Sequence, residues 1–272
     1  MKKVLIVFNG VSYPGHVLDF AIKIAGIGSS LLHAVFMKPL HADEGMQYPF
    51  PNDLSLTEDK FSKLEEEQTD IKVIEGNKKI FKNDCAAGNI ECNIDDELEI
   101  PLDDLIEHSK FSDLIIADAN DDLGKYSITE LLARSHCPVI LVQRYSAVPQ
   151  QVFLAYDGSM SSVHAIKMYS YLFPEWINVN TFLVSVNPEK ENEINNQKYL
   201  QDWLTQHFSQ LTIKIMKGKP EKELLNFLHA NSEKALMVMG AYGKKGLSRL
   251  FHESLADSII NKSNASLFIS HQ

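Results

Sequence analysis

The stretch ALMVMGAYG at residues 235–243 decides the fold of this chain. Its first five residues are apolar, as is typical of a strand buried in a parallel sheet. Gly240 and Gly243 follow, and a helical pattern begins after them. Backbone N–H groups point outward at the N-terminus of a helix, and glycine lets a ligand approach the backbone closely. The stretch therefore predicts a strand, a phosphate-binding loop and a helix, in that order.

The chain contains an internal repeat. An apolar run that ends in Asn9-Gly10 has the same pattern as a later run that ends in Asp157-Gly158. Each is followed by a helical stretch and a second apolar run, at a spacing that predicts βαβ units and parallel sheets with helices on both faces. The strands that we expect are residues 4–8, 31–37, 113–117 and 138–142 in the first copy, and 152–156, 179–186, 235–239 and 266–270 in the second.

A polar junction with a proline, at residues 147–149, follows the last strand of the first copy. Dividing the chain there gives domains of residues 1–147 and 148–272, each of ordinary length for one domain. The first domain is longer because it contains an insertion around residues 40–75. We therefore predict an α/β fold made of two repeated, doubly wound, five-stranded parallel-sheet domains.

The composition argues against several classes of protein. The 272 residues carry a net charge of −10, which disfavours a nucleic-acid-binding surface. No apolar stretch approaches the roughly 20 residues that span a bilayer, and the run at residues 4–8 is too short for a signal peptide, so we expect a cytoplasmic protein. The three cysteines form no CxxC pair and the histidines show no HxH or HxxxH spacing, so no metal site is predicted.

Two motifs of the second copy resemble those of a known family. Gly240, Gly243 and Ser254 follow the Gly-x2-Gly-x9-Gly-Ser/Thr spacing of the nucleotide loop in the universal stress protein family, with Glu253 in place of the third glycine. The run AYDGS at residues 155–159 resembles the family's segment at the end of its first strand. Because both motifs lie in the right order within a repeat, nearly the whole chain is similar to the tandem, two-domain form of this family.

The resemblance implies a fold and an assembly. Each domain would have the adenine nucleotide alpha hydrolase-like fold, and the two domains would form a pseudo-twofold dimer within one chain. The contact between them would run through their last strands, residues 138–142 and 266–270.

The resemblance also implies a nucleotide site in the C-terminal half. In nucleotide-binding members, the acidic residue after the first strand lies near the ribose and phosphates, and the end of the second strand frames the adenine. The backbone of the glycine loop holds the phosphates, together with the Ser/Thr that follows it. The implied ligand is an ATP-class adenine nucleotide with Mg²⁺, and its expected contacts are Ala155, Asp157, Ser185, Met239, Gly240, Gly243 and Ser254.

Two departures from the family pattern bear on this site. Glu253 places a carboxylate where a glycine would let phosphate approach, and two like charges about 4 Å apart at an effective dielectric of about 20 repel by on the order of 4 kcal/mol. In the first copy, the first strand ends in Asn9, and Asp118, Asp121 and Asp122 stand where the glycine loop would be. We therefore expect any nucleotide to bind in the C-terminal half, with Glu253 deciding whether it binds.

The sequence leaves two functions open. It lacks GxSxG, GxGxxG and GxxxxGK[ST] motifs, so we expect a non-enzymatic stress-response protein that binds a small ligand or nucleotide, with any slow ATP hydrolysis incidental. The alternative is a structural or interaction scaffold without a nucleotide site, whose insertion faces a protein partner or a further copy of the chain. Within the insertion, residues 40–56 predict an extended loop and residues 57–82 a helix.

Overall fold

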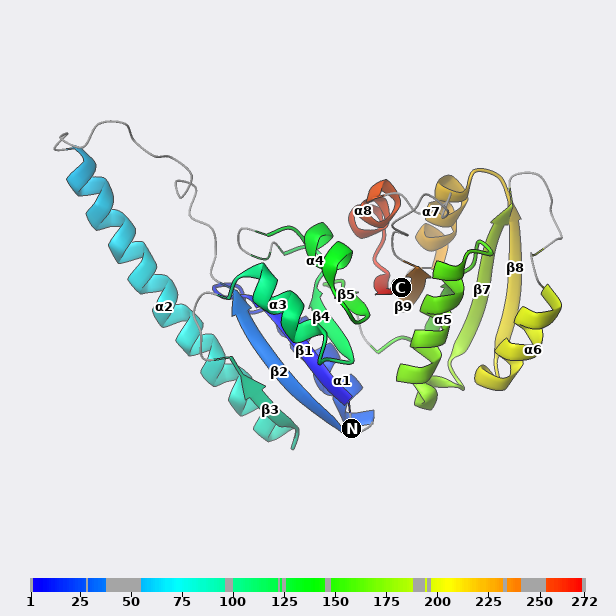
Figure 1. The fold of residues 1–272 in the computed structure, drawn as a ribbon, viewed down its shortest axis with the longest axis horizontal. Helices are drawn as coiled ribbons and strands as arrows, with labels where there is room; N and C mark the ends of the chain where they lie inside the picture. The colour runs from blue at the N-terminus through cyan, green and yellow to red at the C-terminus, as the bar shows by residue number, and fades with distance from the viewer. Residues whose placement is uncertain are drawn as a thin grey trace.

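A computed structural model gives the fold of the chain (Figure 1). Most of the extended loop predicted for residues 40–56 lies outside its description, as do Gly243 and the side chains of Glu253 and Ser254. The structure describes residues 2–27, 29–37, 55–95, 100–121, 123, 126–144, 148–187, 194, 197–231, 234–240 and 253–270, without the side chains of 27, 55–64 and 253–257.

Ten strands form one continuous sheet. They are β1 (Lys2–Asn9), β2 (Ser30–Met37), β3 (Glu91–Ile94), β4 (Leu114–Asp118), β5 (Val139–Val142), β6 (Gln151–Ala155), β7 (Asn180–Asn187), β8 (Leu211–Lys217), β9 (Ala235–Gly240) and β10 (Ser266–Ser270). Their order across the sheet is β3-β2-β1-β4-β5-β10-β9-β6-β7-β8. Neighbouring strands pair in parallel, except that β5 and β10 are antiparallel. Both halves therefore have one strand order and meet about a pseudo-twofold axis, which confirms the predicted fold and the predicted contact through the last strands.

Helices cover both faces of the sheet. One face, which we name the α1 face, carries α1 (Gly15–Ile27), α2 (Ser55–Ala87), α5 (Met160–Leu172) and α6 (Gln197–His207). The opposite face, named the α3 face, carries α3 (Leu102–Ser109), α4 (Ile128–Arg134), α7 (Pro220–Asn231) and α8 (Glu253–Lys262). Because successive strand residues point to opposite faces, Val4 and Ile6 belong to the core of the α1 face and Leu5 and Val7 to that of the α3 face. A short 3-10 helix at Pro174–Trp176 follows α5.

The contact between β5 and β10, which we name the seam, lies in the middle of the sheet. Its register places Phe268 of β10 opposite Ile140 of β5, and both side chains are fully buried. The Phe268 ring packs against the rings of Tyr169 and Phe173, with ring centroids 5.6 and 6.2 Å apart. The two halves therefore share one continuous apolar core across the seam.

A polar bridge completes the seam at one end of β5. The backbone N–H of Gln143 donates to the Ser266 hydroxyl at 3.1 Å, and its side-chain amide donates to the Ile260 carbonyl at 2.8 Å. The Gln143 Oε1 atom accepts from the Asn120 amide at 2.8 Å. Because both ends of the Gln143 side chain have partners, this buried residue joins the halves without the cost of an unpaired polar group.

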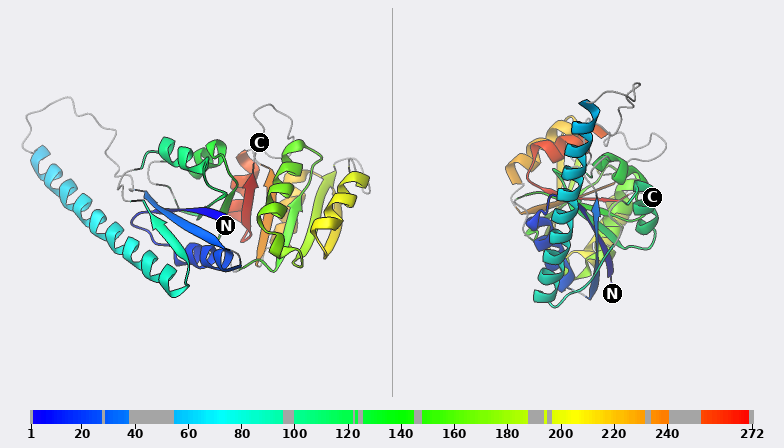
Figure 2. Two further views of the ribbon diagram at one scale, coloured as in Figure 1. Left: turned by 60° about the horizontal axis from the view of Figure 1, so that its bottom comes forward. Right: turned by 90° about the vertical axis from the view of Figure 1, so that its left-hand side faces the viewer.

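The two halves differ most in the helix between their second and third strands. α2 has 33 residues, whereas its counterpart α6 has 11, so the predicted helix at 57–82 is confirmed and is longer than expected. Ile74, Phe81 and Cys85 of α2 are buried in the core of the α1 face, while the N-terminal part of the helix extends beyond the edge of the sheet (Figures 1 and 2). Among the helices in the described part of the chain, none is both long and apolar enough to cross a membrane.

Candidate functional site

The strand registers define equivalent positions in the two halves. Val4 of β1 pairs with Leu114 of β4, and Val152 of β6 pairs with Leu236 of β9. Since β1 and β6 are the first strands of their halves, and β4 and β9 the fourth, Val4 corresponds to Val152 and Leu114 to Leu236. Every other strand position can be matched by counting from these pairs.

Counting toward the carboxyl ends of these strands matches the residues that would surround a ligand. Asn9 corresponds to Asp157, and Asp118 corresponds to Gly240. All four lie at the carboxyl edge of the sheet, the edge at which open parallel α/β sheets bind their ligands.

The helices that follow the first strands can be matched by their buried stripes. Val17 is the first buried residue of α1, and Ser162 is the first buried residue of α5. The positions three, four, seven and eight residues later are buried in both helices. His16 therefore corresponds to Ser161, one residue before each stripe.

Asp157 is held in place by the turn that leads from β6 into α5. Its Oδ1 atom accepts a hydrogen bond of 2.9 Å from the backbone N–H of Ser159, and Gly158 between them has a φ of +83°. Only glycine adopts such a left-handed conformation without strain. Ser159 then caps α5 by accepting from the backbone N–H of Ser162 at 3.1 Å. The Asp157 carboxylate is half-buried and keeps a fixed position at the carboxyl edge.

Gly240 ends β9 directly beneath the first turn of α5. A Cβ atom at this position would lie 2.6 Å from the carbonyl carbon of Ser161 and 2.7 Å from its carbonyl oxygen. No side chain fits in that space, so the close packing of α5 on β9 by itself requires glycine. The sequence analysis assigned this glycine to ligand binding alone, and the packing role is a second reason for it.

The equivalent edge of the N-terminal half is filled by polar side chains. The Asp118 Oδ2 atom lies 3.1 Å from His16 Nε2, and its Oδ1 accepts from the backbone N–H of Asn120 at 2.8 Å. The Asn9 amide donates to Asp121 Oδ1 at 3.2 Å. Two carboxylates therefore occupy the region where phosphates would lie, as the sequence indicated for Asp118 and Asp121. Asp122 lies outside the described residues.

The other predicted contacts are buried in the sheet. Ala155 is 1% exposed, Met239 is 2% exposed and Ser185 is 8% exposed, so little of these three residues is accessible to a ligand. β6 lies between β9 and β7, which brings the ends of the three strands side by side. The fold thus gathers the described part of the predicted site, and Gly243 and the Ser254 side chain lie outside the described residues.

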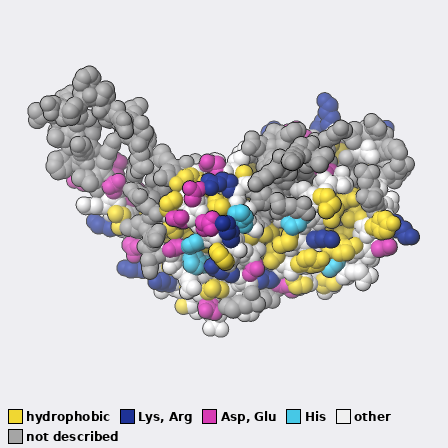
Figure 3. Space-filling view, in the orientation of Figure 1, with side chains coloured by type: hydrophobic (Ala, Val, Ile, Leu, Met, Phe, Trp, Pro, Cys, Tyr) yellow, Lys and Arg dark blue, Asp and Glu magenta, His cyan; other side chains and the backbone are white. Residues whose placement is uncertain are grey.

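A pocket of about 260 Å³ lies between α5 and α6, next to this edge. Hydrophobic side chains gather on the surface above these two helices (Figure 3). Tyr156, one residue before Asp157, forms part of the wall, and burial together with the Asp157 charge raises the pKa of its phenol. The lining residues are Tyr156, Val163, Ile166, Lys167, Tyr199, Leu200 and Trp203.

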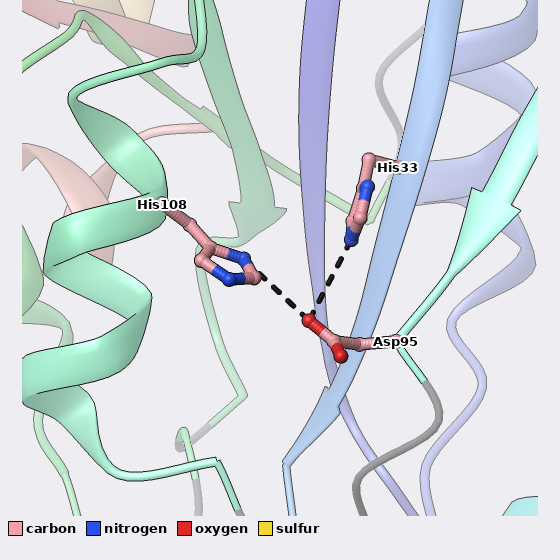
Figure 4. A group of neighbouring side chains, drawn as sticks. All are labelled: His33, Asp95 and His108. Carbon is pink, nitrogen blue, oxygen red and sulfur yellow. Dashed lines mark ion pairs between the residues drawn. The ribbon is translucent and has the colours of Figure 1, made fainter.

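A second cluster, of two histidines and a carboxylate, lies at the far edge of the N-terminal half. His33 of β2, Asp95 just after β3 and His108 of α3 point toward one another (Figure 4). Asp95 Oδ2 lies 3.6 Å from His33 Nε2 and 3.5 Å from His108 Nδ1. Burial lowers the pKa of His33, and the charges of Lys3 and His108 lower it further, while Asp95 opposes these effects. Neutral imidazole is therefore favoured at His33.

The sequence analysis missed this cluster. It searched for histidines at short spacings, whereas His33 and His108 lie on a strand and a helix far apart in the chain. Only 20% of the Asp95 side chain is exposed. No local pattern carries this signal, because the pairing of β2 with β3 is what brings Asp95 to His33.

Comparisons with known proteins agree with this architecture. No protein-family model matches the sequence, and no curated protein matches it. Among solved structures, a universal stress protein from Archaeoglobus fulgidus DSM 4304 superposes with a TM-score of 0.64 at 16% identity, over 98% of each chain. A putative universal stress protein from Pseudomonas aeruginosa UCBPP-PA14 gives a TM-score of 0.56 at 15% identity, over 100% of this chain and 93% of that one. A functionally unknown protein from Pseudomonas aeruginosa PAO1 gives 0.54 at 13% identity, over 100% and 92%.

Proposed function

We propose that this chain, which has the fold of full-length universal stress proteins, is a non-enzymatic stress-response protein that binds an adenine nucleotide in its C-terminal half. The observation that carries the proposal is the contrast at the end of the fourth strand. Gly240 leaves the carboxyl edge of the C-terminal half without a side chain, whereas Asp118 and His16 fill the equivalent place in the N-terminal half. A polyanionic ligand avoids an edge that already holds carboxylates.

The groups near Gly240 suit the remaining parts of a nucleotide. The fixed Asp157 carboxylate can accept hydrogen bonds from ribose hydroxyls, and such charge-assisted bonds are the stronger kind. The neighbouring pocket offers the aromatic walls of Tyr156 and Trp203, together with the positive charge of Lys167. These residues support an ATP-class ligand at this edge, with Mg²⁺ able to offset the charge of Glu253 when bound.

Calorimetric titration of the purified chain with ATP, with and without Mg²⁺, tests the proposal. We expect one site per chain with micromolar affinity. The variant Glu253→Gly should bind more tightly, by up to roughly three decades if the carboxylate faces the phosphates. Binding only in the variant would mean that Glu253 keeps the site closed, and binding in neither protein would reject the nucleotide.

A matched pair of variants locates the site. Asp157→Asn introduces the residue found at the equivalent N-terminal position and keeps an oxygen that can accept from Ser159. Loss of a charged hydrogen bond should weaken ATP binding by about 10- to 100-fold. Asn9→Ala changes the equivalent residue of the N-terminal half and should leave the affinity unchanged. Equal losses in both variants would show that the binding is not local to Asp157.

Helix α2 supports a second candidate, self-association of the chain. Val73 and Ile80 lie on one side of this long helix and are 38% and 46% exposed. Apolar side chains two turns apart on an exposed helix are a common basis for helix–helix contact. If α2 mediates assembly, Val73→Glu combined with Ile80→Glu should shift the chain to monomer in sedimentation velocity. An unchanged sedimentation coefficient in the variant would reject α2 as the contact.

A further inference from the structure

We propose that His33, Asp95 and His108 form a binding site for one divalent transition-metal ion of the Zn²⁺ class. The three side chains lie on the α3 face at the outer edge of the N-terminal half, where β3 ends the sheet. This inference does not depend on the proposed nucleotide site, which lies in the other half of the chain.

The backbone holds each of the three residues in position. His33 lies in the middle of β2 and points to the same face as Val35, which belongs to the core of the α3 face. The backbone N–H of Asp95 donates to the Ala34 carbonyl at 3.0 Å, which fixes Asp95 just beyond the end of β3. His108 follows the fully buried Leu105 by one turn of α3, so its ring faces the sheet. All three ligands are therefore carried by ordered backbone.

The separations between the ligand atoms suit a metal ion. Zn²⁺ lies about 2.0–2.2 Å from nitrogen and oxygen ligands, so two ligands in tetrahedral geometry are about 3.4 Å apart. Here Asp95 Oδ2 lies 3.6 and 3.5 Å from the two histidine nitrogens, and the three atoms all lie within 4.8 Å of one another. A small rotation of the side chains would bring all three to bonding distance of one ion.

The two histidine nitrogens make no hydrogen bond of normal length within the described part of the chain. His33 Nε2 and His108 Nδ1 are both buried, and they meet the Asp95 carboxylate at 3.6 and 3.5 Å, beyond the usual length of a hydrogen bond. Unpaired buried polar atoms are costly, so their convergence on one carboxylate oxygen needs a reason. A shared cation satisfies all three atoms at once.

The kinds of ligand select the kind of metal. Imidazole nitrogen suits zinc and its neighbours in the first transition row, whereas Ca²⁺ and Mg²⁺ prefer sites built from oxygen. Three protein ligands leave a fourth position for water or another ligand. The His108 side chain is 38% exposed, compared with 18% for His33, so that position would open toward the solvent on the α3 side.

The same place in the C-terminal half shows that the fold does not require these residues. His33 pairs with Leu5 in β1, as Phe182 pairs with Phe153 in β6, so His33 corresponds to Phe182. In register with these, Asp95 corresponds to Lys214, two residues after the partner of Phe182 in β8.

An aromatic and cationic cluster closes that place in the C-terminal half. Lys214 Nζ lies 5.0 Å from the ring centroid of Phe227 in α7, and Phe227 packs on Phe153 at 4.9 Å. Phe182 packs on the same Phe153 ring at 5.6 Å. Packing alone can therefore fill this position, and the two histidines and the carboxylate of the N-terminal half are a separate chemical feature.

Zinc titration of the full-length chain, prepared without a histidine tag and stripped with a chelator, tests the proposal. Calorimetry should give one Zn²⁺ per chain at micromolar affinity or tighter, and no comparable heat with Mg²⁺. Co²⁺ should give the intense visible absorption of a four-coordinate site. Failure to bind one Zn²⁺ per chain would overturn the proposal.

Variants distinguish this site from incidental binding to surface histidines. His108→Gln and Asp95→Asn each remove one ligand and should weaken Zn²⁺ binding by about 100-fold or more. His33→Phe introduces the equivalent C-terminal residue and should do the same. His136→Gln changes an exposed histidine of the same half and should leave the affinity unchanged.

A thermal-shift measurement shows whether each variant is folded. Zn²⁺ should raise the Tm of the wild type and of His136→Gln, but not that of folded His108→Gln, because a ligand that binds only the folded state stabilises it. Equal Zn²⁺ affinity in His108→Gln and the wild type would overturn the proposal, whatever the result for His33→Phe. ATP titration of the same variants should be unchanged, so the two proposals fail independently.

Discussion

At the end of the fourth strand, the N-terminal half places Asp118 beside His16, and the C-terminal half places Gly240 against Ser161. The strands have the same order and register, and the helices above them have the same buried stripe. One half nevertheless fills this edge with a histidine and a carboxylate, while in the other half helix and strand lie too close for a side chain on Gly240. The shared fold therefore sets where a ligand could lie, and the side chains set which half could accept it.

The outer edges of the two halves differ in the same direction. The N-terminal half gathers His33, Asp95 and His108, whereas the C-terminal half closes the equivalent place with Phe182 and Lys214. The N-terminal half thus carries histidine and carboxylate groups at both places, whereas the C-terminal half carries none at the equivalent positions. If both proposals hold, the nucleotide and the metal ion bind in different halves of one pseudo-symmetric chain.

The largest expected effect concerns the seam, where the rings that pack on Phe268 belong to the C-terminal half. Phe268→Ala removes a fully buried ring that packs on Tyr169 and Phe173, and it should lower the free energy of unfolding by about 3–5 kcal/mol. Ile140→Val, at the position opposite in β5, should cost only about 0.5–1.5 kcal/mol. Urea unfolding of both variants gives these values. Similar losses would show that the Phe268 ring contributes no more to the seam than one methyl group of Ile140.

An intermediate effect tests the contrast at the fourth strand directly. Gly240→Asp copies the N-terminal residue into the C-terminal half, where the Cβ atom would lie 2.6 Å from the Ser161 carbonyl carbon. The forced shift of α5 should cost about 1–3 kcal/mol of unfolding free energy. Gly26→Ala, at an exposed helical glycine with no atom within 4 Å of the added Cβ, should instead stabilise by about 0.5–1 kcal/mol. Wild-type stability of Gly240→Asp would mean that helix and strand separate easily, and the contrast between the halves would lose its steric basis.

The smallest expected effect concerns Cys137. All three cysteines of the chain belong to the N-terminal half. Burial raises the pKa of the Cys137 thiol to about 12, well above the value of about 8.5 expected in the unfolded chain. Folding thus favours the neutral thiol. Its contribution to the free energy of unfolding is complete below about pH 8 and is lost as the pH rises toward 12.

Urea unfolding at pH 8 and pH 10 measures this loss. Cys137 should account for about 1–2 kcal/mol of the decrease between these two values. Cys137→Ala should show a correspondingly smaller decrease, whatever its stability at pH 8. Parallel decreases in the variant and the wild type would assign the pH dependence to other groups.

Much of the fold could be predicted because it depends on local patterns. Apolar runs that end in Asn9-Gly10 and Asp157-Gly158 identify the first strands, and the family resemblance implies the seam. The position of Asp157 also follows locally, since its hydrogen bond to Ser159 spans two residues. The steric role of Gly240 could not be predicted in this way, because the atoms that exclude a side chain belong to a helix reached only through the rest of the half.

The sequence by itself determined the period of the strands and helices, the repeat, and the residues that end each strand. Those features depend on neighbours along the chain, where hydrophobic alternation and glycine conformation act over a few residues. Only the tertiary structure decided that His33, Asp95 and His108 meet at one point, and that Asp118 and His16 occupy an edge where the other half has Gly240 packed against Ser161. Strand pairing and helix packing bring together residues whose distance in the sequence carries no information about their distance in space.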